Sequence, residues 1–65
     1  MSPLQRFIAD NREQAASERE HATRRKVLLE VADGSWKDLL EEEIRHHESL
    51  ATLLEELADF AEARQ

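Results

Sequence analysis

Cysteine is absent from this chain of 65 residues, which excludes disulfide bonds and thiolate metal sites. The absence fits a cytosolic protein. A single core of this size seldom supplies more than about 3–5 kcal/mol of net stability, so small proteins usually add a disulfide, a metal or a partner chain. Without disulfides, the remaining options are association with another chain, a metal bound by other ligands, or very good helix packing.

Long apolar runs are also missing. No stretch approaches the ~20 apolar residues of a membrane span, and the first residues do not begin the apolar run of a signal peptide. The net charge is −6, so the chain lacks the clustered Lys and Arg that a nucleic-acid or anionic-membrane surface needs. We therefore expect a cytoplasmic protein that binds neither nucleic acid nor membrane.

Helix-breaking residues are scarce, with one Pro and one Gly in the chain, and both lie where helix ends need them. Ser2, Pro3 and Gln5 have the spacing of a helix start with a capping box. Gly34 can adopt the left-handed conformation that ends a helix. Between these signals the sequence predicts an uninterrupted helix over about residues 3–32.

A second helix is predicted after a short turn. Ser35 followed by Asp38 is a second box-like start signal, and the helical pattern then continues over about residues 36–64. A connection as short as residues 33–35 makes two helices antiparallel neighbours. We predict an all-α fold in which residues 1–65 form one antiparallel helical hairpin.

The two predicted helices differ in charge. Residues 3–32 carry six basic and five acidic side chains, whereas residues 33–65 carry three basic and ten acidic ones. This contrast favours contact between the helices, although exposed ion pairs are individually weak. An alternative use of the charge is an acidic inhibitor that mimics nucleic acid and occupies the groove of an enzyme. Its expected acidic face comprises Glu41, Glu42, Glu48, Glu55, Glu56, Asp59 and Glu62.

The second predicted helix has too much apolar surface for one neighbour. Apolar residues occupy four of its seven heptad positions, and one partner helix covers fewer. Facing residue numbers in the hairpin should sum to about 67, which places the leucines of residues 50–57 against residues 10–17, where apolar side chains are few.

We expect this surface to be buried on a second copy, giving a homodimeric antiparallel four-helix bundle. A groove on a different protein is the alternative. The residues expected to contact a partner are Trp36, Leu39, Leu40, Leu50, Leu53, Leu54, Leu57 and Phe60.

All three histidines fall in one polar layer of the predicted hairpin, with His21 level with His46. Glu18 and His21, and Glu43 and His46, have Glu-x-x-His spacing, which puts both side chains of each pair on one helix face within reach of one metal ion. The spacing resembles the ligand pairs of ferritin-like di-iron proteins, including small encapsulated ferritins whose site lies across a dimer of helical hairpins. That resemblance implies iron held by these four residues. Zinc is the other metal considered for this site, with His47 as a further ligand.

Two other interpretations of the layer need no metal. It can set the register of the helices through His–Glu and Arg–Glu hydrogen bonds, with Glu43 near Arg24 and Arg25. It can also be a histidine cluster that responds to pH.

The sequence contains no Gly-rich loop, no Ser/His/Asp set and no P-loop or Rossmann signal. We therefore expect a non-enzymatic interaction module without a cofactor: a homo-oligomeric hairpin that binds or regulates a partner protein. A metal-binding bundle and an acidic inhibitor are the alternatives.

Overall fold

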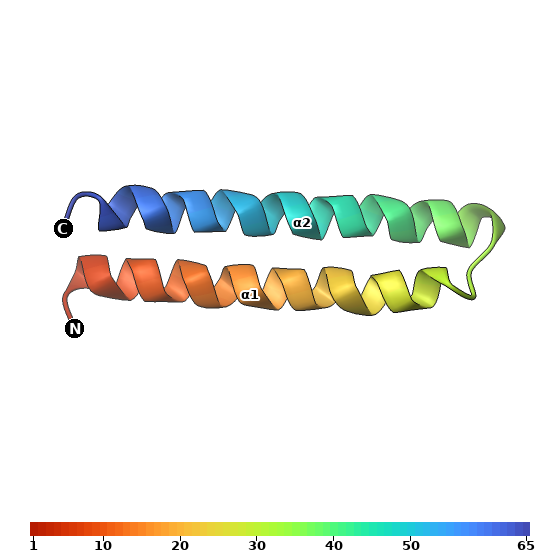
Figure 1. The fold of residues 1–65 in the computed structure, drawn as a ribbon, viewed down its shortest axis with the longest axis horizontal. Coiled ribbons are helices and arrows are strands. Elements are labelled where there is room, and N and C mark those ends of the chain that lie inside the picture. The colour runs from red at the N-terminus through yellow and green to blue at the C-terminus, as the bar shows by residue number, and fades with distance from the viewer.

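Two long antiparallel helices lie side by side in the computed structural model, which describes all 65 residues (Figure 1). Helix α1 spans Pro3–Leu29 and helix α2 spans Gly34–Glu62. The molecule measures 48 × 15 × 12 Å, and both chain ends lie at the end opposite the turn (Figure 1). No segment of either helix is both long and apolar enough to cross a membrane. The predicted all-α hairpin is confirmed.

The start of α1 is the predicted capping box. The Ser2 hydroxyl accepts a hydrogen bond from the backbone N–H of Gln5 at 3.1 Å, and the Gln5 side-chain oxygen accepts one from the backbone N–H of Ser2 at 3.0 Å. Pro3 occupies the first helical turn, where its missing N–H costs no intrahelical bond. These contacts satisfy donors that a helix N-terminus otherwise leaves free.

The turn uses more of the chain than predicted. Helix α1 ends at Leu29, three residues before the predicted limit, because the N–H groups of Glu30 and Val31 bond to carbonyls three residues back and tighten the last turn. Residues 30–33 then cross the ~8–10 Å that separate the axes of packed helices. Gly34 has the expected left-handed conformation, with φ 55°, but it begins α2 and does not end α1 as predicted.

The predicted capping box at Ser35 and Asp38 is wrong. The N-cap of α2 is Asp33, whose side chain makes no capping hydrogen bond, while its backbone carbonyl accepts the N–H of Lys37 at 3.2 Å. Because the helix already begins at Gly34, Ser35 lies inside the first turn and cannot act as its cap. Helix α2 ends two residues earlier than predicted.

A seam of small side chains joins the helices. Nine residues of the chain are buried and five of them are alanine, so the helices approach closely but bury little volume. In the two buried clusters the numbers of facing residues sum to 66 or 69, which agrees with the predicted register. The two buried clusters are Ile8 with Ala58 and Ala61, and Ala15 with Ala51 and Leu54.

Candidate interaction surface

Two sets of residues on α2 share the same spacing along the helix, and one of them forms the seam with α1. The residues of α2 that face α1 recur at alternating intervals of three and four, as in Leu40, Ile44, His47, Ala51 and Leu54. Moving each position back by one residue gives a second set with the same intervals. Because successive helix residues are about 100° apart, this second set forms a stripe about 100° around α2 from the seam. We call it the α2 stripe: Trp36, Leu39, Glu43, His46, Leu50, Leu53, Leu57 and Phe60.

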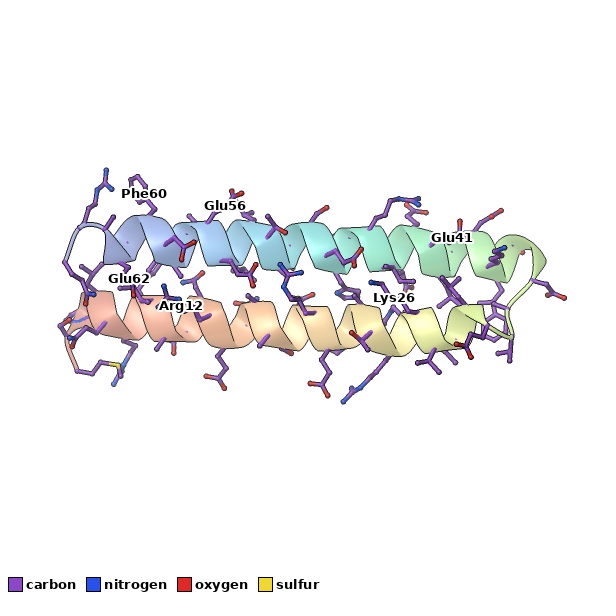
Figure 2. All side chains as sticks on the ribbon, viewed as in Figure 1. Arg12, Lys26, Glu41, Glu56, Phe60 and Glu62 are labelled. Carbon is purple, nitrogen blue, oxygen red and sulfur yellow. The ribbon has the colours of Figure 1, made fainter.

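The α2 stripe is apolar and largely open to solvent. Leu53 and Phe60 are 52% and 58% exposed, and Leu50 alone among its apolar members is half-buried. Phe60 lies on the side of α2 that is turned away from α1 (Figure 2). Six of the eight residues predicted to contact a partner lie on this stripe, so the hairpin leaves them accessible.

The other two predicted contact residues lie elsewhere. Leu40 and Leu54 are only 5% and 8% exposed, because they belong to the seam and pack between the helices. A partner therefore cannot reach them while the hairpin is intact. The accessible surface instead gains two residues of α1 that the sequence did not single out, Phe7 and Leu28, each 43% exposed. The sequence could have identified them by the same rule, because Phe7 and Leu28 each come one residue before a seam residue of α1, namely Ile8 and Leu29.

The opposite flank of the seam carries ion pairs between the helices. Arg12 bonds to Asp59 and Glu62 at 3.2 and 3.0 Å, and Arg19 donates two hydrogen bonds to Glu55. The hydrogen bonds from Arg19 and Arg12 lower the pKa of Glu55 and of Glu62 below their usual values. The side chains of Arg12 and Glu62 approach each other between the helices (Figure 2).

These pairs neutralise much of the expected acidic face. Lys26 also bonds to Glu48, at 2.8 Å. Four of the seven carboxylates of that face are therefore matched by α1, namely Glu48, Glu55, Asp59 and Glu62. Glu41, Glu42 and Glu56 have no basic partner within 4.0 Å, and these three are a small charge for a nucleic-acid mimic.

The predicted polar layer is present, but its contacts run across the helices. The Nδ1 atom of His47 lies 2.5 Å from a carboxylate oxygen of Glu18, and both side chains are over four-fifths buried. The His47 ring also stacks on His21 and meets the edge of His46, with centroids 5.3 and 5.6 Å apart. Glu43 bonds to Arg25, as predicted.

The Glu-x-x-His pairs do not converge on a common point. Glu18 is bonded to His47 and Glu43 to Arg25, and neither carboxylate makes a hydrogen bond to the histidine three residues after it. No three His, Asp or Glu side chains of the chain are arranged to hold a metal ion. The hydrogen bond with His47 lowers the pKa of Glu18, and the one from Arg25 lowers the pKa of Glu43. Both carboxylates are thus held in the charged form by partners within the hairpin.

No protein-family model, curated protein or solved structure matches this chain. Its function is inferred from the surface and the layer alone.

Proposed function

We propose that this protein is a non-enzymatic interaction module that acts as a homo-oligomeric helical hairpin and binds a partner protein. The observation that carries the proposal is the exposed α2 stripe. Six of its eight members are large apolar residues, and they recur at the intervals with which one helix packs along another. A helix that merely faced water would present polar residues at these positions.

The size of the surface supports this proposal. A half-exposed large apolar side chain leaves on the order of 100 Å² in water, so the accessible members of the stripe with Phe7 and Leu28 expose roughly 700 Å². The largest apolar patch of a typical monomer is about 300–600 Å². A standard protein interface buries about 800 Å² on each partner. The stripe is therefore close to the size of one side of an interface.

The shape of the single chain points the same way. Its accessible surface is 4763 Å², whereas a compact protein of 7.6 kDa has about 4,300 Å². Its radius of gyration is 14.9 Å, against about 11 Å for a compact chain of this length. No large side chain is fully buried. Association would supply the core that the lone hairpin lacks.

The surface offers little for catalysis on a small molecule. Its one hollow holds about 120 Å³, whereas ligand pockets usually hold about 300–1,000 Å³. The hollow lies on the ion-pair flank, where Arg19, Lys26 and Glu48 already bond to partners of their own. These features support a binding role rather than an enzymatic one.

Two neighbouring substitutions test the proposal. Leu53 lies on the stripe, while Thr52 is also exposed to solvent but lies outside it. We expect the wild-type protein and Thr52→Glu to sediment with at least two chains per particle, and Leu53→Glu to sediment as one chain. A wild-type protein that stays folded and sediments as one chain would contradict self-association.

The same pair of variants tests whether binding of a partner protein depends on the stripe. A protein that binds the wild-type hairpin and Thr52→Glu, but is lost with Leu53→Glu, depends on the oligomer or its stripe. A partner retained by all three proteins would contradict the role of the stripe in binding.

A further inference from the structure

We propose that the α2 stripe is occupied by the α2 stripe of a second copy, running antiparallel. The two hairpins then form a four-helix bundle with their turns at opposite ends, and facing residue numbers of the two α2 helices sum to about 96. This arrangement rests on the proposed function, because it requires the stripe to be an interaction surface. It adds which helix occupies the stripe, in which direction and in which register.

The angle between the two stripes of α2 suits a bundle. A helix at the corner of a four-helix bundle contacts two neighbours in directions about 90° apart. On α2, the seam that faces α1 and the exposed stripe differ by one residue position, which is about 100°. One direction is already filled by α1, so the exposed stripe points to where the next helix of a bundle would lie.

The helix that fills this place is α2 of the second copy rather than α1. On α1, the residues one position before each seam residue form a corresponding stripe, and the middle of this α1 stripe is polar. With both turns at the same end, Leu53 and Leu57 would face Gln14 and Asp10 of the second copy, and these polar groups would lose water without gaining a partner. The α1 stripe comprises Phe7, Asp10, Gln14, Ser17, His21, Arg24 and Leu28.

The register follows from covering every apolar member of the stripe. A sum of about 96 places Trp36 opposite Phe60 of the second copy and Leu39 opposite Leu57, while the two pairs repeat at the other end by symmetry. A slip of one heptad in one direction would leave Leu57 and Phe60 beyond the start of the second α2 at Gly34, and a slip in the other direction would leave Trp36 and Leu39 beyond its end at Glu62. The unslipped register buries the most apolar surface.

The two polar members of the stripe lie near the two-fold axis of this dimer. Glu43 would face Leu53 of the second copy, and its carboxylate is already bonded to Arg25 of its own chain. His46 would face Leu50 of the second copy, with its ring beside His47. A polar centre flanked by apolar ends on both sides favours one register over its neighbours.

Spin labels on single cysteines measure this arrangement directly, because the natural chain contains no cysteine. Lys37 and Ser49 are exposed and lie outside the stripe. In the proposed register the two Lys37→Cys labels of a dimer are separated by 22 residues, about 33 Å, along the bundle axis. The two Ser49→Cys labels are separated by two residues, about 3 Å along the axis. Pulsed dipolar spectroscopy should therefore give a much longer distance for Lys37→Cys than for Ser49→Cys.

Other distances would overturn the arrangement. Turns at the same end remove the axial separation, so the Lys37→Cys distance would be as short as that of Ser49→Cys. A one-heptad slip would change the axial separation at Lys37→Cys from about 33 Å to about 22 Å in one direction or about 44 Å in the other. Either result rejects this arrangement while leaving self-association intact. Absence of coupling from both labels, with a single-chain mass in sedimentation, would instead reject the proposed function. Coupling should disappear when Leu53→Glu is added to either variant.

Discussion

Leu53 and Leu54 are adjacent in the sequence but lie in different environments, which makes them a matched pair for substitution by alanine. Leu54 is 8% exposed and packs with Ala15 and Ala51 in the seam. Leu53 is 52% exposed on the stripe. Truncating a buried leucine costs about 2–5 kcal/mol, whereas most exposed substitutions change stability by under about 0.5 kcal/mol. A lone hairpin should therefore tolerate Leu53→Ala and lose much of its stability with Leu54→Ala.

Association changes the expected cost of Leu53→Ala. Fully burying a leucine contributes about 1.5–3 kcal/mol, so covering the remaining half of Leu53 contributes roughly 1 kcal/mol per chain, and the cavity left by truncation raises the loss to about 1–2 kcal/mol. A dimer loses this twice, about 2–4 kcal/mol in all. Because a tenfold change in a dissociation constant corresponds to 1.4 kcal/mol, the dissociation constant of the dimer should rise roughly 30- to 700-fold.

Urea unfolding followed by circular dichroism measures the stability of the wild-type protein and of Leu53→Ala. The wild-type midpoint should rise with protein concentration, because unfolding is then coupled to dissociation. Leu53→Ala should lower the midpoint and weaken that dependence at low concentration, where the variant is already dissociated. If Leu53→Ala instead matches the wild-type midpoint at every concentration, the stripe contributes nothing to stability and the reasoning is refuted.

Three further outcomes follow from the hairpin itself. Acid should destabilise the hairpin, because the pKa values of Glu18 and Glu43 in the folded protein lie below the usual 4.5, so their stabilisation is full above the unfolded pKa and is lost as pH falls through the folded pKa. The urea midpoint should therefore decrease once the pH is below about 4.5, and it should decrease less steeply in Glu43→Gln. A midpoint that rose in acid would contradict this. Ser2→Ala removes the hydroxyl of the capping box and should cost about 1 kcal/mol in the free energy of unfolding, with Ser2→Thr as the control that keeps the hydroxyl. Zinc should leave the melting temperature unchanged, because Glu18 and Glu43 are bonded within the hairpin; a rise that His47→Ala abolishes would restore the metal-binding alternative.

The hairpin and its register were predictable because local signals agreed with one another. The capping box of Ser2 and Gln5 marked the start of α1, and the short turn fixed the direction of the second helix. Gly34 did not mark the end of α1, because α1 ends at Leu29 and Gly34 begins α2. The limits of the turn were not predictable to the residue. They depend on how far the chain must travel between two packed helices, which no local pattern records.

The interaction surface was only half predictable. Heptad counting finds four apolar columns on α2 but does not say which two of them α1 will cover. The structure assigns Leu40 and Leu54 to the seam, where they are 5% and 8% exposed and Leu54 packs with Ala15, and it leaves Leu53 and Phe60 outside. The surface expected from sequence therefore mixed residues of both stripes.

The polar layer was predicted in position but not in its bonds. Glu18 and His21 share a helix face at the spacing of a ligand pair, yet Glu18 bonds to His47 on the other helix. Spacing along one helix says which side chains can meet. It does not say which of them a neighbouring helix will engage first, and here the cross-helix partner is the closer one.

Sedimentation equilibrium of the wild-type chain tests the central claim most directly, because it measures mass without reference to shape. We expect a particle of twice the 7.6 kDa of one chain across micromolar concentrations, and a mass near that of one chain for Leu53→Glu. A folded wild-type protein that sediments with the mass of one chain at every concentration would contradict the account.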